Sequence, residues 1–319
     1  MPPEAPPPGP EHGLDRDAWM RRLAQIGADH GLFDRIGAHH LGLFIEEGET
    51  LLIAFDRAER AWRETSDGLP AGFDMVRRRS WSLLSIMAEG ETWFRGAPLL
   101  RFFRTLKDSG ILAGYHRVIF YGVGPDCGFA ACAFAGLVPG ARVLAAAPVA
   151  TLNRAEAPFE RRFRAARRLD FHGPVGNGPR GLAKSDGALV LYDPTDVAEA
   201  AQAALFSGRN TLRVGLPYAG RDFARILLNG EAAAPLLRML EREMPTAAAV
   251  RTALKEPIRE NPGTMIRWSR AALVQGHARR AARIARDGLA ATGDRRLRAL
   301  LAETRAEAEL NGRAEAETV

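Results

Sequence analysis

Residues 116–135 read HRVIFYGVGPDCGFAACAFA, and this stretch decides the fold. An apolar run that ends at Tyr121 is followed by a turn with three glycines, Gly122, Gly124 and Gly128, and then by an apolar stretch of helical type. A strand, a tight glycine turn and a helix, in that order, form the frame of a nucleophile elbow. Glycines suit such a turn because it leaves little room for side chains, and the helix start favours negative charge. We therefore expect a ligand or a reacting group at this turn.

Apolar runs similar to the first one recur on both sides of the turn. They are residues 50–55, 81–87, 141–147, 188–192 and 211–216. Longer stretches with periodic apolar faces alternate with them, and the expected helices are residues 99–106, 128–135, 197–205, 221–228 and 232–244. This βαβα order predicts an α/β fold with a mostly parallel sheet and helices on both faces. Ligands of such sheets bind beyond the carboxyl ends of the strands.

The length of 319 residues predicts a large domain with a smaller appendage. We expect a flexible proline-rich tail at residues 1–13, an α/β domain at 14–250 and a small helical segment at 251–319. Residues 257–262, with a proline at each end, are expected to form a linker. The helical segment is similar to one tetratricopeptide-type hairpin, but a single repeat buries little, and packing on the sheet domain is the alternative that we favour.

Composition excludes several classes of function. The net charge of +6 comes mainly from arginine clusters such as residues 161–168, which we interpret as solvated helix faces and not as a nucleic-acid surface. The two cysteines, Cys127 and Cys132, fit neither a zinc site nor a disulfide framework, so we expect no metal and a reducing, cytoplasmic environment. No apolar stretch is long enough to span a membrane.

The glycine turn resembles that of α/β-hydrolase-like proteins, whose elbow reads Tyr-Gly-x-Ser-Met-Gly-Gly-Tyr-Ala-Ala. Further similarity covers about residues 41–228 and lies in Phe55-Asp56, Trp81-Ser82, Trp93-Phe94-Arg95, Pro139-Gly140-Ala141 and Asp193-Pro194. The resemblance implies an α/β-hydrolase-like fold and a site built from a nucleophile, an acid and a histidine.

The nucleophile that the resemblance implies has no serine here. Aligned from its left end, the motif places the serine position on Gly124. Aligned from its right end, it reads Gly-x-Asp-x-Gly and places Asp126 where some members of the superfamily carry an aspartate nucleophile. Cys127 is a second candidate, because a helix start stabilises a thiolate. The structural alternatives are a helix N-cap for Asp126 and a small, tightly packed residue for Cys127.

The acid position is present, but the histidine position is empty. Asp193 follows the run 188–192 and matches the acid, with a structural turn as the alternative. The loop that should carry the histidine, residues 216–221, reads LPYAGR. His172, in the insertion after the run 141–147, is a candidate for a displaced base, with a solvated loop histidine as the alternative. Arg95 is the arginine best placed to hold an anion at the turn, unless it forms a salt bridge.

Three functions remain open at this point. The first is a catalytically degenerate hydrolase-like protein that binds a small ligand or a protein partner at the old cleft. The second is an active hydrolase of an ester, a thioester or a related substrate, with Asp126 or Cys127 as nucleophile, Asp193 as orienting acid and His172 as base. The third is a nucleotide-handling protein similar to phosphoadenosine-phosphosulfate reductase, although its Ser-Gly-Gly-x-Asp-Ser run and C-terminal cysteine motif are absent. We expect no cofactor.

Overall fold

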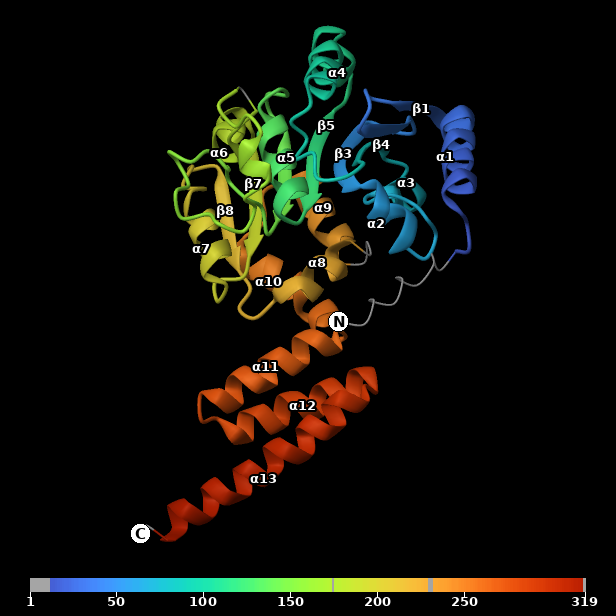
Figure 1. The fold of residues 1–319 in the computed structure, drawn as a ribbon. Helices are drawn as coiled ribbons and strands as arrows, with labels where there is room; N and C mark the ends of the chain where they lie inside the picture. The colour runs from blue at the N-terminus through green and yellow to red at the C-terminus, as the bar shows by residue number, and fades with distance from the viewer. Residues whose placement is uncertain (1–11, 174, 229–231, 318–319) are drawn as a thin grey trace.

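The computed structural model describes residues 12–173, 175–228 and 232–317. All but the last two residues of the predicted tail, 1–13, lie outside this part. One sheet of eight strands forms the centre of the molecule (Figure 1). Its strands are β1 Gly31–Arg35, β2 His40–Ile45, β3 Thr50–Arg57, β4 Ser82–Ala88, β5 Arg117–Val123, β6 Arg142–Ala146, β7 Gly187–Tyr192 and β8 Thr211–Gly215.

The strand order in the sheet is β1-β2-β4-β3-β5-β6-β7-β8. Pairing is antiparallel between β1 and β2 and between β2 and β4, and it is parallel from β4 to β8. The prediction of a mostly parallel α/β sheet is confirmed. All six predicted strands are present, with ends that differ from the prediction by at most two residues.

The two N-terminal strands, β1 and β2, were not predicted. Helix α1 Arg16–His30 is capped by Gly31, and the chain continues directly into β1. This edge strand is largely exposed, so its sequence lacks the apolar character of the inner strands. His40 begins β2 and is buried, with its Nε2 2.9 Å from Thr92 Oγ1.

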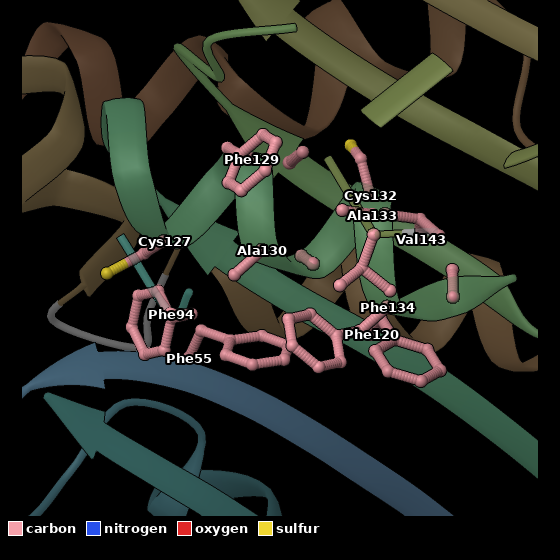
Figure 2. Close-up of a cluster of buried hydrophobic side chains, with 14 of the residues drawn as sticks. Phe55, Phe94, Phe120, Cys127, Phe129, Ala130, Cys132, Ala133, Phe134 and Val143 are labelled. Carbon is pink, nitrogen blue, oxygen red and sulfur yellow. The ribbon is translucent and has the colours of Figure 1, made fainter. Parts of the chain in front are cut away.

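Alternate residues of the inner strands build two separate cores. On one face, Phe55 and Phe120 pack with α4 Ala97–Asp108 and α5 Pro125–Ala135, as Figure 2 shows for α5. On the other face, Leu52 packs in a second core with α1 and with the helices that follow β8. Helix α5 is buried from Asp126 to its end, which explains why it carries only small and apolar residues after that point. Both faces of the sheet are therefore covered, as predicted for parallel strands.

The remaining elements follow the expected alternation. They are α2 Ala58–Arg63, α3 Phe73–Arg79, η1 Ile111–Gly114, η2 Ala166–Arg168, α6 Gly178–Gly181, η3 Leu182–Lys184, α7 Val197–Ala204, α8 Gly220–Leu228 and α9 Ala233–Arg242. The arginine cluster at residues 161–168 is a correction to the sequence analysis. It forms no helix face, since only the single turn η2 is helical there.

The C-terminal part consists of α10 Ala247–Arg259, α11 Pro262–Val274, α12 Ala278–Thr292 and α13 Arg295–Glu317. The expected linker is instead the end of α10, which continues through Pro257, and the start of α11. Helix α10 buries Val250 and Leu254 in the core of the sheet domain, so the predicted boundary at 250/251 falls inside an element of that core.

Helices α11, α12 and α13 extend away from the sheet as a separate layer (Figure 1). They share a small core of their own, formed by Met265, Ala285, Leu297 and Leu300. The favoured expectation, that the hairpin-like segment packs on the sheet domain, holds for one side of α11, where Trp268 packs against the core of that domain. Within the described residues, no helix has the length and apolar character needed to cross a membrane.

Candidate functional site

The predicted strand–turn–helix unit is present between β5 and α5. Gly124 joins them with φ +96° and ψ 173°, a conformation that residues with a side chain rarely adopt. Its N–H donates to Ala146 O at 2.9 Å, and its own carbonyl accepts from Gly128 N at 2.9 Å. A Cβ at Gly124 would meet no atom within 4 Å. Gly124 is therefore the open tip of the turn, which is where an elbow holds its nucleophile.

The two other glycines of the turn allow close packing. A Cβ on Gly122 would lie 2.1 Å from the carbonyl oxygen of Cys127, and one on Gly128 would lie 3.0 Å from Pro148 Cβ. Because these two residues have no side chain, α5 can pack directly against β5 and against the segment that follows β6. The space around both glycines is filled by the protein itself.

Pro125 is a feature of the turn that the sequence analysis missed. It is the first residue of α5 and directly follows the tip. In an α/β-hydrolase elbow, the backbone N–H of this residue helps to bind the oxyanion of the tetrahedral intermediate. Proline has no backbone N–H, so this donor does not exist here. The proline itself was the signal in the sequence that could have revealed this.

Asp126 is the buried member of an ion pair. Its side chain is 2% exposed, and Oδ2 accepts from Arg57 Nε and lies 2.9 Å from Arg57 Nη2. Gly124, not Asp126, is the N-cap of α5, so the expected capping role is wrong. Burial opposes the charge on Arg57, but the carboxylate of Asp126 outweighs this effect and raises the pKa of Arg57. The sequence analysis missed Arg57, which lies at the end of β3.

A second buried ion pair lies beside the first. Asp56, next to Arg57 in the chain, pairs with Arg60 one turn later in the chain, and its carboxylate also accepts from Ala71 N at 2.7 Å. The end of β3 therefore places two acid–arginine pairs near the start of α5. Through these contacts the end of β3 is joined to α5 by Arg57 and to the segment around Ala71 by Asp56.

Cys127 is buried in the apolar cluster that also contains Phe94 (Figure 2). Burial raises the pKa of its thiol well above the ordinary value, the carboxylates of Asp126 and Asp56 add to the rise, and Arg57 opposes it. The thiol is therefore protonated at neutral pH. This is the opposite of the thiolate expected at a helix start, because the cost of burial exceeds the effect of the helix.

Asp193 lies after β7 and points its carboxylate at the loop after β8. Oδ1 accepts from Thr195 N at 2.9 Å, from Thr195 Oγ1 at 2.6 Å and from Tyr218 N at 3.0 Å, and Oδ2 accepts from Gly220 N at 3.1 Å. The side chain is 6% exposed. The acid position and the loop that would hold the histidine are thus brought together as predicted, but the carboxylate binds backbone groups of that loop.

Helix α11 holds the same loop from its other side. Arg267 Nε donates to Tyr218 O at 2.9 Å, Arg267 Nη2 donates to Ala219 O, and Trp268 Nε1 donates to Pro217 O at 2.8 Å. Tyr218 has φ +59°, so the loop turns sharply at this residue. The loop is fixed between Asp193 and α11, a connection that no local sequence pattern indicated.

His172 and Arg95 both lie in the region of the insertion after β6. His172 is exposed, and its Nδ1 is 3.2 Å from Asn153 Nδ2. Arg95 donates to the carbonyls of Asp170 and Val175, and burial lowers the pKa of its guanidinium group, against the effect of Asp170. In the parts of the chain that the structure describes, neither side chain forms a hydrogen bond or ion pair with Asp126, Cys127 or Asp193.

A metal centre finds no support in the described residues, among which no group of three or more histidine, cysteine, aspartate or glutamate side chains could hold an ion.

Comparison with known proteins places these positions in context. No family model and no curated protein matches the sequence. Among solved structures, carboxyl esterase 2 from the fungus Tuber melanosporum is 13% identical over 65% of this chain and 83% of that one, with a TM-score of 0.42. EstE1, a carboxylesterase from a metagenomic library, is 13% identical over 75% and 96%, with a TM-score of 0.40. A capsule O-acetyltransferase of Neisseria meningitidis serogroup A is 9% identical over 66% and 95%, with a TM-score of 0.43.

The chain has an α/β-hydrolase-like fold. The turn follows β5, the acid position follows β7 and the loop without histidine follows β8, which is the order of site positions that the resemblance implies.

Proposed function

We propose that this α/β-hydrolase-like protein is catalytically degenerate and binds a small ligand or a protein partner at the carboxyl edge of its sheet. The observation that carries the proposal is the tip of the turn, Gly124 followed by Pro125. These two residues supply neither a nucleophile nor the N–H that would stabilise an oxyanion.

The other site positions support the same proposal. The carboxylate of Asp193 accepts four hydrogen bonds from Thr195, Tyr218 and Gly220, so it has partners that do not need a histidine. Asp126, the alternative nucleophile, is almost fully buried and paired with Arg57. A carboxylate in that position attacks a substrate only after the ion pair has opened, which costs free energy before any bond is formed.

The active-hydrolase alternative is tested by a turnover assay on the purified full chain. The substrates are p-nitrophenyl esters of increasing acyl length and an acyl thioester, and the variants are Asp126→Asn, Cys127→Ala and His172→Ala. The exposed Asp34→Asn serves as a control for the loss of one carboxylate. We expect no turnover above the buffer rate for the wild type, and no change in any variant.

Turnover by the wild type that is lost in Asp126→Asn and retained in Asp34→Asn would contradict the proposal. A covalent acyl or alkyl adduct on Asp126 or Cys127, found by mass spectrometry of the intact protein after incubation with substrate, would do the same. Either result would establish the alternative nucleophile directly.

The nucleotide-handling alternative gains no support from the turn. A phosphate loop needs free backbone N–H groups and space, whereas Gly122 and Gly128 are used for packing α5. We do not propose it further.

A further inference from the structure

The insertion after β6 contains a cavity that is separate from the turn. Its volume is about 540 Å³, which falls in the range of small-molecule sites. The lining residues all lie between positions 154 and 168: Arg154, Pro158, Glu160, Arg161, Arg164, Arg167 and Arg168. Five of the seven are arginines, so the wall of this cavity carries a concentrated positive charge.

The one acid in the wall is already neutralised. Glu160 is buried, and its carboxylate accepts from Arg162 Nε at 3.0 Å, from Arg162 Nη2 at 2.7 Å and from Gln202 Nε2 at 3.0 Å. Burial opposes its ionisation, but the hydrogen bonds from Arg162 and Gln202 and the charge of Arg162 together outweigh burial and lower the pKa of Glu160. Arg162 does not line the cavity, so the charge of Glu160 is balanced from outside it.

Other nearby acids are also engaged away from the cavity. Glu156 pairs with Arg180 and accepts from Asn177 Nδ2, and Asp170 accepts from the N–H of His172. These contacts leave the arginines of the wall without a carboxylate from this segment.

Of the five arginines that line the cavity, one has a guanidinium group held by hydrogen bonds to other residues that the structure describes, and the other four do not. Arg167 is held by donating to Glu160 O and Ala157 O, and its buried Nε has no acceptor within the described residues. Four exposed side chains of the wall form no hydrogen bond or ion pair in the part of the chain that the structure describes: Arg154, Arg161, Arg164 and Arg168. Clustered guanidinium groups repel one another, and a bound anion removes this repulsion.

We propose that this cavity binds a compact polyanion, a small molecule that carries at least two phosphate groups. Planar guanidinium groups bind phosphate oxygens in pairs, and several groups around one concave space favour clustered phosphates over a single carboxylate. The volume of about 540 Å³ is that of a small-molecule site, which favours a small molecule over a nucleic-acid backbone. The inference does not depend on the state of the elbow, because no lining residue belongs to it.

The test measures binding of pyrophosphate to the full chain by isothermal titration calorimetry. The variant is Arg161→Gln/Arg164→Gln, and the control is Arg78→Gln/Arg79→Gln, which removes the same charge from exposed arginines of α3. We expect one site per chain, about tenfold or greater weakening in the cavity variant and at most about twofold in the control. Circular dichroism confirms that both variants are folded.

Two further arms identify the source of the phosphates. Inositol trisphosphate is titrated in solution, and sedimentation with phosphatidylcholine vesicles is compared with and without a phosphatidylinositol bisphosphate. Binding in either arm that depends on Arg161 and Arg164 supports the proposal and shows whether the carrier is soluble or a lipid headgroup. The proposal is overturned if pyrophosphate does not bind at millimolar concentration, if both double variants weaken binding equally, or if only an oligonucleotide binds.

Discussion

The contacts of Asp193 lead to a prediction that separates a structural role from a catalytic one. In Asp193→Ala, the backbone N–H groups of Thr195, Tyr218 and Gly220 lose their acceptor. Each buried donor left without a partner costs about 1 to 3 kcal/mol. Because water reaches part of this loop, we expect a total loss of about 3 kcal/mol in the free energy of unfolding, equivalent to a fall of about 5 °C in Tm for a chain of this length.

The Asp193→Asn variant should lie between the wild type and alanine. Its amide oxygen can replace Oδ1, but its amide nitrogen faces the N–H of Gly220, so we expect about half of the loss. Urea and thermal unfolding, followed by circular dichroism, measure these changes. The neighbouring Asp196→Ala removes only the N-cap of α7 and should cost about 1 kcal/mol.

The reasoning is refuted if Asp193→Ala unfolds within about 0.5 kcal/mol of the wild type, or if it is more stable. That result is expected of a catalytic carboxylate held in a strained site and not of one that anchors a loop.

Three other perturbations test the turn, a buried histidine and the C-terminal contact. Gly122→Ala places a methyl group 2.1 Å from a carbonyl oxygen and should destabilise by about 3 kcal/mol, whereas Gly114→Ala meets open space and should leave Tm unchanged. Burial lowers the pKa of His40 from 6.5 to about 4, so the folded protein loses about 3 kcal/mol of stability as pH falls through this interval. His40→Gln should flatten that part of the curve of unfolding free energy against pH. Arg267→Ala should raise amide hydrogen exchange at residues 218–220, measured by mass spectrometry, and equal exchange in both proteins would contradict the contact.

The inner strands and the turn could be predicted because their signals are local. Runs such as residues 117–121 are apolar throughout, and such runs are typical of strands covered on both faces. The position of Asp193 followed from the strand before it. By contrast, β1 exposes most of its residues, and α10 continues through Pro257, so the local pattern gave no sign of either element.

The partners of the candidate residues could not be predicted, since they come from distant parts of the chain. Arg57 reaches Asp126 only because β3 and β5 are neighbours in the sheet. Likewise, α11 contacts Tyr218 across 49 positions of sequence. The raised pKa of the Cys127 thiol results mainly from burial, which the sequence indicated only through the apolar residues around it. The order of the strands in the sheet determines these contacts, and a short sequence motif does not reveal that order.

The four hydrogen bonds to Asp193 also limit how this scaffold could be redesigned. An engineer who introduced Gly124→Ser and Tyr218→His would supply a hydroxyl and an imidazole, but the carboxylate needed to orient the ring would still be occupied by backbone amides. Freeing it would release the loop that α11 and Asp193 hold between them, and Pro125 would still offer no hydrogen to an oxyanion. Esterase activity on this framework would therefore require rebuilding a loop and a helix start together, since no single substitution improves the site by itself.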